Sequence, residues 1–184
     1  MRVLVVTPPE PIVDLDLAKA HLRVTTDDED VLIESYVEAA QASVDGPLGW
    51  LSRSIAVQTL EARAASFSCF ARLPFGPVQS IASVVHIDAE GEEVEVDVAL
   101  YQLVDGGLGL AASVSWPSVH PSAEAVRVRY VAGYDTPPAA VRQAVLLLIG
   151  QWFRNRSAVN VGNIVSSLPN GVESLLAPFR YLGT

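Results

Sequence analysis

Cysteine is nearly absent from this sequence of 184 residues, in which Cys69 stands alone. A single cysteine excludes an internal disulfide framework and a zinc site built on cysteines. Cys69 lies between Phe67 and Phe70, and free cysteine is among the most buried residue types. We therefore expect a buried, inert thiol.

Long apolar runs are missing as well. The longest run after the N-terminus, Ala144–Ile149, is far too short to cross a bilayer. The N-terminal stretch MRVLVVTPPEP has too few apolar residues for a signal peptide, and no small-residue cleavage site follows it. These absences predict a soluble protein made in the cytoplasm, with no membrane partner.

Motifs of catalysis and cofactor binding are also missing: the chain has no G-x-S-x-G, phosphate loop, H-E-x-x-H or G-x-G-x-x-G. The three histidines, His21, His86 and His120, fall in different predicted elements and form no metal-binding set. We expect His86, on a strand with apolar neighbours, to be a satisfied structural histidine. The acidic runs 27–30 and 88–97 lack EF-hand spacing. The residues thus predict no catalytic, cofactor or metal site.

Positive charge is scarce, since 12 Lys and Arg stand against 21 Asp and Glu, a net charge of −9. This balance disfavours nonspecific binding to DNA phosphates. The charge is uneven: residues 1–50 are mostly acidic among their charged residues, whereas Glu173 is the one acid after Thr136. Such polarity suits end-to-end stacking on differently charged neighbours, and it is equally compatible with chance.

The longest helical pattern covers Thr136–Arg156. Thr136 is placed to cap the helix, and Pro137 suits the first helical position. Apolar residues recur at helical spacing on more than one face. We therefore expect a core helix that is buried on several sides or shared between the core and a partner.

Three shorter helices are predicted, at Leu15–Leu22, Asp27–Val44 and Asn170–Ala177. Asp14 is placed to cap the first, and Asn170 to cap the last. Thr26 and Glu29 form a capping box for the second. Residues 157–167 lack any period and are predicted to be a mobile loop.

Between residues 54 and 132 the apolar period changes to alternation. Ser80–Ile87 and Glu92–Val98 predict an antiparallel hairpin with one solvated face. Other predicted strands are Tyr101–Val104, Leu108–Trp116, Ala125–Tyr134 and, as a short strand or extended arm, Val3–Val6. The acidic hairpin face and the basic face of Arg127 and Arg129 are either paired across a sheet or simply solvated.

The order of helices, strands and helices predicts the α+β class, as a helical bundle with an inserted small antiparallel β-sheet. We expect one domain over residues 1–184. Its helical frame would cover residues 14–48 and 136–182, and its β insertion about 54–134.

Five stretches occur together in this chain: VTPPEPIVDLDLAKAHLRV, DDEDVLIESYVEAA, LPFGPVQSIASVVHIDAEGE, VRVRYVAGYDTPPAAVRQAVLLLIGQWFRNRSAV and LLAPFR. Their order and spacing resemble those of the head–tail connector proteins, also called adaptor or head completion proteins, of long-tailed bacteriophages, prophages and gene transfer agents. The resemblance covers nearly the whole chain.

The resemblance implies a structural protein and not an enzyme. Such a protein forms a ring of its own copies, twelvefold in the virion, beneath the portal of a DNA-filled head. The ring lies in the neck of a particle whose proteins are made in the bacterial cytoplasm. It extends the DNA channel, which passes DNA without sequence-specific binding, and contacts the next connector or tail protein. Acidic residues would suit the channel wall because they repel DNA phosphates.

The resemblance also implies a surface that docks to the portal, and aromatic and Arg side chains are the usual anchors of interfaces. The candidates are Trp152, Arg154, Arg156, Phe179, Arg180 and Tyr181. For Arg154 and Arg156, capping of the long helix is an equal alternative.

Two other functions stay open at this stage. A small hydrolase of particle maturation or host penetration would need a cleft of converging polar residues. A monomeric module that regulates another protein would differ from a ring in its apparent mass.

Overall fold

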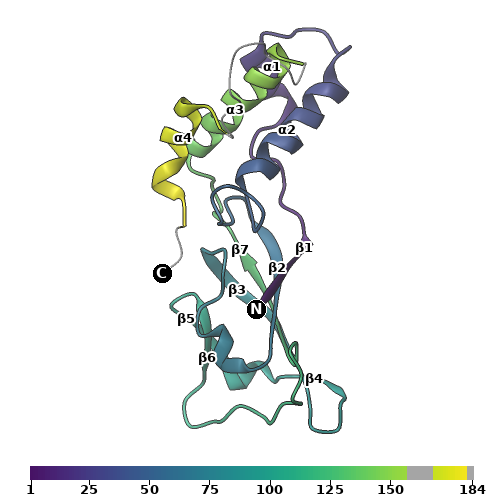
Figure 1. The fold of residues 1–184 in the computed structure, drawn as a ribbon, viewed down its shortest axis with the longest axis vertical. Coiled ribbons are helices and arrows are strands. Elements are labelled where there is room, and N and C mark those ends of the chain that lie inside the picture. Colours follow the sequence, from purple (N-terminus) through teal and green to yellow (C-terminus); the bar gives the residue numbers. More distant parts are fainter. Residues whose placement is uncertain (157–167, 182–184) are drawn as a thin grey trace. The chain divides into compact units, whose positions relative to one another are not determined.

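The computed structural model describes residues 1–156 and 168–181, apart from the side chain of Asn170. The chain divides into two compact units, each built from two segments of sequence. The sheet unit contains residues 1–10 and 53–135, and the helical unit contains residues 11–52 and 136–184 (Figure 1). These bounds lie close to the predicted helical frame and β insertion, except that the N-terminal segment joins the sheet. That the two units act as one domain stays a prediction, and the predicted 157–167 loop lies outside the described residues.

The helical unit contains four α-helices in its described part: α1 (Leu15–Leu22), α2 (Asp30–Val44), α3 (Ala139–Arg154) and α4 (Asn170–Leu176). A 3₁₀ turn, Ala177–Phe179, follows α4. Helix α3 contacts the other three helices, as its multi-sided apolar pattern predicted. Gly150 of α3 allows a close approach of α1, because a Cβ there would lie 3.1 Å from Nε2 of His21.

The N-terminus of α1 is capped as predicted, whereas the caps expected for the other helices are wrong. Asp14 accepts a hydrogen bond of 2.7 Å from the amide of Leu17. Thr136 does not cap α3, which begins only after Pro138. A residue before proline is pushed towards extended backbone, so consecutive prolines delay the start of this helix. Helix α4 begins at Asn170 itself, with Pro169 in the N-cap position.

The predicted capping box of α2 is also wrong. Glu29 is the N-cap residue and makes no capping hydrogen bond with its side chain. Its carboxylate instead forms an ion pair with Arg156, and Asp27 lies 2.7 Å from Nζ of Lys19. Ion pairs with other segments have therefore replaced the local capping pattern.

The sheet unit contains a five-stranded antiparallel sheet in the order β1-β2-β7-β3-β4. The strands are β1 (Arg2–Thr7), β2 (Gln58–Ala64), β3 (Val78–Ile87), β4 (Glu93–Glu95) and β7 (Val126–Ala132). A separate ribbon pairs β5 (Tyr101–Val104) with β6 (Gly107–Leu110). The α+β class and the predicted hairpin are confirmed, but the sheet is larger than the small sheet expected. The strand predicted to reach Trp116 ends at Leu110.

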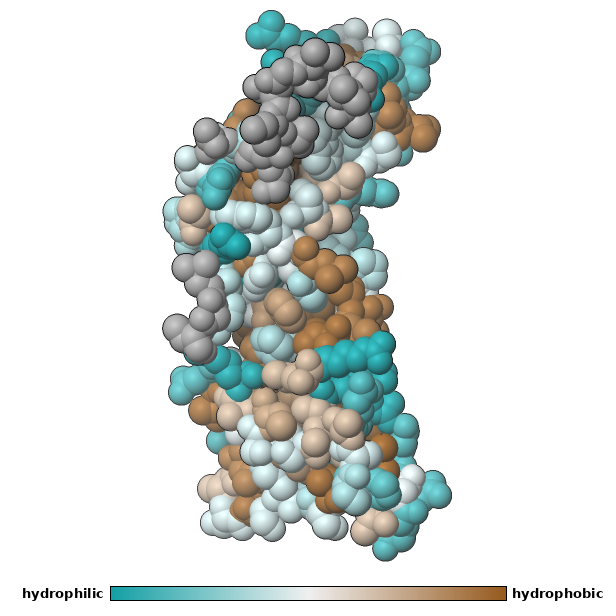
Figure 2. All heavy atoms as spheres, viewed as in Figure 1, coloured by the Kyte–Doolittle hydropathy of each residue, from teal (hydrophilic) through white to brown (hydrophobic). Residues whose placement is uncertain are grey.

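Strand β1 forms an edge of the sheet and leaves apolar side chains in contact with solvent. Val5 is 45% exposed and Val6 is 43% exposed. Figure 2 shows a hydrophobic zone over this strand on the face in view. The N-terminal arm is thus a true strand, paired antiparallel with β2.

One face of the sheet carries the core of this unit, built around Tyr130. Its hydroxyl donates a hydrogen bond of 2.8 Å to the carbonyl of Pro74, and burial raises the pKa of Tyr130. Phe67 and Phe70 pack into the same core from a 3₁₀ turn, Phe67–Phe70. Residues three apart lie on the same side of a 3₁₀ turn, so Cys69 points outward.

Cys69 is exposed, which makes the prediction of a buried thiol wrong. A contact of 3.4 Å with the Ser66 hydroxyl lowers the pKa of the Cys69 thiol. His86 is buried beside Phe67, with ring centroids 5.8 Å apart, so its structural position is confirmed. Its Nδ1 atom, however, has no hydrogen-bond partner in the described part of the chain, so the histidine is not fully satisfied.

Candidate docking surface

The structure divides the six predicted docking residues into two groups at opposite ends of α2. The first group is Trp152, Arg154 and Arg156, and the second is Phe179, Arg180 and Tyr181. Arg156 forms an ion pair with Glu29, directly before α2. Tyr181 donates its amide to the carbonyl of Leu51, whose own amide bonds to the last residue of α2, Val44. Helix α2 has 15 residues and is about 22 Å long, so the six residues do not form one surface.

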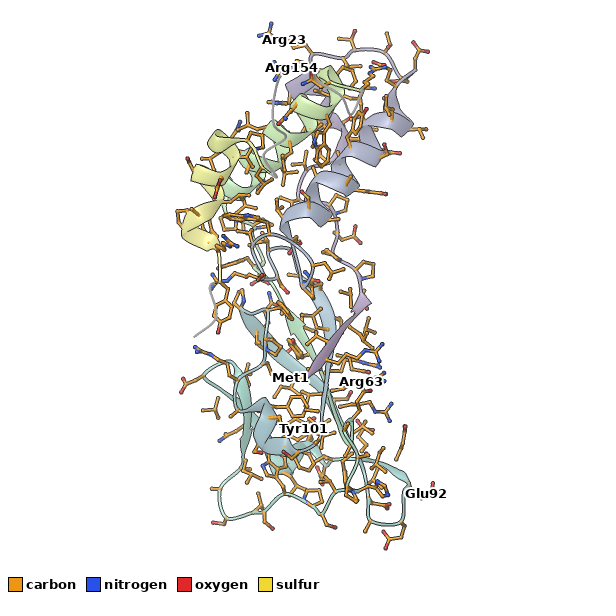
Figure 3. All side chains as sticks on the ribbon, in the orientation of Figure 1. Met1, Arg23, Arg63, Glu92, Tyr101 and Arg154 are labelled. Atoms are coloured by element: carbon orange, nitrogen blue, oxygen red, sulfur yellow. The ribbon has the colours of Figure 1, made fainter. Side chains whose placement is uncertain are left out.

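The two arginines of the first group form hydrogen bonds with α3 itself. Nε of Arg154 donates to the carbonyl of Gly150 at 3.0 Å, and Nε of Arg156 donates to that of Phe153 at 3.4 Å. The last four carbonyls of a helix lack partners within the helix. Phe153 belongs to these four residues in α3 and Gly150 lies directly before them, so both arginines donate to carbonyls at the end of the helix. Figure 3 shows Arg154 at the same end of the helical unit as Arg23. The geometry favours the capping alternative for Arg154 and Arg156.

The second group lies against the loop that follows α2. The guanidinium carbon of Arg180 is 4.3 Å from the centroid of the Trp50 ring, a cation–π contact. The amide of Tyr181 lies 2.9 Å from the carbonyl of Leu51. Tyr181 is 37% exposed and Phe179 is half-buried. The C-terminal segment is therefore held on the 45–52 loop.

Leu48 at the tip of this loop is 99% exposed, the largest exposure among the large hydrophobic side chains of the described chain. We call the combined region the Leu48 surface; it consists of Leu48, Trp50, Phe179, Arg180 and Tyr181. Leu48 and Trp50 were not predicted as docking residues. The turn residues around them predicted only a helix end, and no local signal connects residues 48–50 with residues 179–181.

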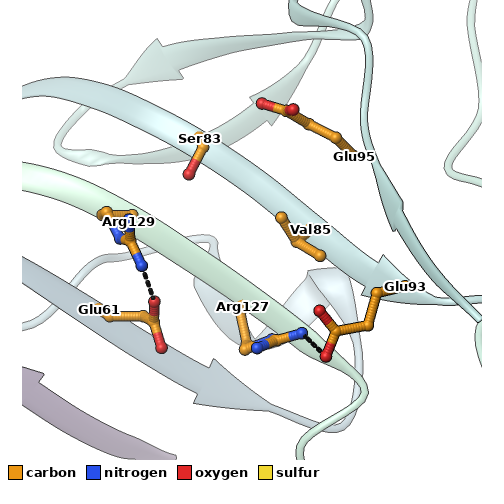
Figure 4. A pocket seen from close by; sticks show the side chains of 7 residues that line it. All are labelled: Glu61, Ser83, Val85, Glu93, Glu95, Arg127 and Arg129. Atoms are coloured by element: carbon orange, nitrogen blue, oxygen red, sulfur yellow. Dashed lines mark hydrogen bonds and ion pairs between the residues drawn. The ribbon is translucent and has the colours of Figure 1, made fainter.

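The face of the sheet opposite its core carries the charged side chains of the alternating strands. The sequence had left open whether the acidic and basic side chains pair with one another or are solvated. Figure 4 shows Arg129, which lies 2.8 Å from Glu61, and Arg127, which pairs with Glu93. Arg63 also pairs with Glu61, at 2.7 Å. The predicted pairing of the acidic hairpin face with the basic face is therefore confirmed for Glu93 and Arg127, whereas Arg129 pairs with Glu61 of β2. Burial raises the pKa of Glu61, but its hydrogen bonds with Arg129 and Arg63 outweigh this effect and lower it.

A shallow cavity of about 230 Å³ lies on this charged face, lined by Glu61, Ser83, Val85, Glu93, Glu95, Arg127 and Arg129. Two of its carboxylates are neutralised by arginines, and the lining contains no histidine or cysteine. The charge network therefore links neighbouring segments of the sheet unit through ion pairs.

The described residues also contain no group of three or more His, Cys, Asp or Glu side chains that could hold a metal ion. Within the same residues, every helix is too short or too polar to span a bilayer.

Comparison with known proteins identifies the family. The sequence model of the head completion protein family matches residues 11–181. No curated protein matches the chain. Three solved chains share its fold at 24% sequence identity, each covering 100% of this chain and 97% of its own length. They come from the neck of an empty gene transfer agent (GTA) particle computed with C6 symmetry (TM-score 0.77), the virion of the native GTA particle (0.75) and the neck of the native particle computed with C12 symmetry (0.70).

The family match covers nearly the whole chain and agrees with the resemblance seen in its sequence stretches. This protein therefore belongs to the head completion protein family, which confirms its predicted role as a structural head–tail adaptor.

Proposed function

We propose that this protein forms a ring in the neck of a phage-like particle, where it joins the portal of a DNA-filled head to the tail. The observation that carries the proposal is the family match over residues 11–181. Its fold is shared with chains from particle necks that were computed with sixfold and twelvefold symmetry. A ring closes through head-to-tail contacts in which two different faces of each copy meet.

In this proposal, α1–α4 form the helical bundle, and the exposed faces of the long helices pack between copies. Leu147 of α3 is 36% exposed although its neighbours Leu146 and Leu148 are buried. Gln143 and Leu147 are both exposed and lie four residues apart, so they share one side of α3. A second copy would cover Leu147 on this side of the helix.

Acidic side chains of the ring would face the DNA channel, without sequence-specific contacts to DNA. Glu34 and Glu38 of α2 are exposed, lie one turn apart and have no ion-pair partner among the described residues. Like charge would let the duplex slide without sticking to the wall. The tail-side partner would be the next connector or tail protein.

The portal would contact the C-terminal group of docking residues, Phe179, Arg180 and Tyr181. Their support is that Arg180 and Tyr181 are exposed and Phe179 is half-buried, since aromatic and Arg side chains are typical interface anchors. The protein would act by binding alone, without catalysis or a cofactor.

Co-sedimentation tests the proposal. The purified chain would be mixed with portal-bearing, DNA-filled heads that lack this protein, and bound copies per portal would be counted. We expect binding in a fixed ratio and restored tail attachment. A folded chain that does not bind such heads would contradict the proposal.

A further inference from the structure

The five-stranded sheet ends in two open edges, β1 and β4, and both belong to the sheet unit (Figure 1). In the described part of the chain, β1 pairs only with β2, and β4 pairs only with β3. The outer side of an edge strand presents unpaired N–H and C=O groups, with which another chain can pair. The side chains at an edge decide whether such pairing is prevented or favoured.

Strand β1 has few of the features that keep edge strands from pairing. From Arg2 to Val5 it contains one charged side chain, that of Arg2, and no proline, and its one irregularity of register comes after Val5. Val5 is 45% exposed although it pairs with Leu60, which is fully buried in the core. Paired residues of neighbouring strands lie on the same face of a sheet. The apolar core face therefore remains partly exposed at the β1 edge.

Strand β4 has the same arrangement with the opposite charge. Val94 is 39% exposed and pairs with His86, whose side chain is buried. Glu93 and Glu95 lie on the other face of the sheet, where they line the charged cavity (Figure 4). The two edges thus share an exposed valine on the core face and differ in the charge of the opposite face.

The charges at the two edges are available to another chain. Arg2 lies opposite Arg63, on the face of β2 that also carries the cavity residue Glu61. The Arg2 side chain is 63% exposed, and its ion pair with Glu124, at 3.6 Å, is a surface pair of little net energy. Glu95 has no ion pair in the described chain. Arg2 and Glu95 therefore stand on the same face at opposite ends of one sheet.

The strand order determines how the two edges would meet. Each neighbouring pair in the order β1-β2-β7-β3-β4 is antiparallel, so β1 and β4 run in the same direction. In a ring of many copies, a small rotation relates neighbours and preserves both strand direction and the side to which the sheet faces. The β4 strand of one copy would then pair in parallel with β1 of the next, with core face beside core face.

We propose that β1 of each copy pairs with β4 of the next copy in the ring, with Arg2 facing Glu95 of the next copy. This inference rests on the proposed function and names the contact between copies. A ring closes when two different faces of each copy fit one another, and the two sheet edges are such a pair.

A strand from the portal or from a tail protein fits these edges less well than a second copy. Such a strand on β1 would fill one edge and leave β4 open in every copy. Pairing between copies fills both edges with one kind of contact, as closure removes the edges of a barrel. The charges select it as well, because the carboxylates that suit Arg2 stand at the other edge of the same sheet.

The test compares Arg2→Glu and Glu95→Arg with wild type in the head co-sedimentation assay. Each variant should bind heads at least about tenfold more weakly, because like charges then meet at every contact between copies. An equal mixture of the two variants should bind as wild type does, since alternating copies in a ring of even number join opposite charges at every contact. Glu90→Arg is the matched control, because Glu90 is exposed in the turn before β4, and it should bind normally.

Circular dichroism should show all variants folded, because the substituted side chains are exposed. If wild type and both single variants bind heads equally well, the edge contact is overturned while the proposed function stands. Losses that the mixture does not restore would also overturn it, and would assign the β1 edge to the portal. Normal head binding with lost tail attachment would assign the edges to the tail-side protein, and an equal loss in Glu90→Arg would reduce the effect to overall charge; either result overturns the contact. Failure of wild type to bind heads would overturn both proposals.

Discussion

The sheet unit and the helical unit use their arginines in different ways. In the sheet unit, Arg63 and Arg129 both pair with Glu61, and Arg127 pairs with Glu93, so the positive charge of each is balanced by a carboxylate of the same unit. In the helical unit, Arg180 is exposed and its guanidinium lies over the ring of Trp50. Leu48 precedes Trp50 by two residues in the same loop. An arginine that already pairs with a carboxylate or carbonyl of its own unit is therefore a weaker candidate for an interface than Arg180.

Arginines also differ from one another within the helical unit, as Arg154 and Arg156 show. They are of the same residue type as Arg180 and lie in the same unit, but they donate to carbonyls at the end of α3. We therefore expect substitutions of the three arginines to have different consequences.

The largest effect is expected for Arg180→Glu, which should weaken binding to portal-bearing heads by tenfold or more, at least about 1.4 kcal/mol. The change removes the cation–π contact with Trp50 and reverses the charge of a residue in the proposed portal contact. Co-sedimentation across a range of protein concentrations measures the change. Arg154→Glu is the matched control and should bind heads normally. Equal losses in both variants would break the comparison between the two ends of the unit.

The next largest effect is expected for Glu61→Gln, which should lower the free energy of unfolding by about 1–2 kcal/mol and leave head binding unchanged. The buried carboxylate accepts hydrogen bonds from two arginines, and a neutral amide cannot replace its charge. Urea denaturation measures the difference. Glu95→Gln is the control, because Glu95 lines the same cavity but has no ion pair among the described residues. A loss of head binding in Glu61→Gln with stability intact would assign the charged face to an interface.

The acid dependence of stability sharpens the same point. The folded-state pKa of Glu61 is lowered from its ordinary value of 4.5, so its contribution is present above about pH 4.5 and is lost as the pH falls through the lower, folded value. The stability difference between wild type and Glu61→Gln should therefore be full at neutral pH and shrink below about pH 4.5. Denaturation at several pH values checks this. A difference that stays constant down to strongly acidic pH would show that the charge of Glu61 is not what stabilises the sheet.

The smallest effect is expected at Cys69. The exposed thiol should react with a maleimide in the native protein, without prior unfolding. Cys69→Ser should change the free energy of unfolding by less than about 0.5 kcal/mol, as expected for a surface position. Mass spectrometry of the labelled protein and urea denaturation give the two readouts. Labelling that requires denaturant would show that Cys69 is buried, contrary to this prediction.

Much of the fold could be predicted because it depends on residues close in sequence. The helical period of apolar residues predicted the bounds of α1 and the central position of α3. Strict alternation predicted the β3–β4 hairpin. Strand β2 was not predicted as a separate strand, since its alternation mixes alanines with charged residues. The capping errors have different causes: Glu29 is engaged by Arg156, which is distant in sequence, whereas Pro137 and Pro138 delay the start of α3.

The docking surface could be predicted only in part. Phe179, Arg180 and Tyr181 were chosen for their residue types, and the structure shows that Arg180 and Tyr181 contact the 45–52 loop. Leu48 had no signal, because an exposed and a buried leucine look alike in a sequence.

By itself, the sequence determined the family and the kind of elements in each unit, because periodicity, turns and motif order are local properties. Tertiary structure alone decided which charged side chains pair within the protein and which remain free to contact a partner. The contact between Trp50 and Arg180 joins residues 130 positions apart, and the pairing of Glu61 with Arg129 depends on the register of β2 against β7. Side chains brought together across such distances share no local pattern, so only the folded chain shows which of them are left to meet a partner.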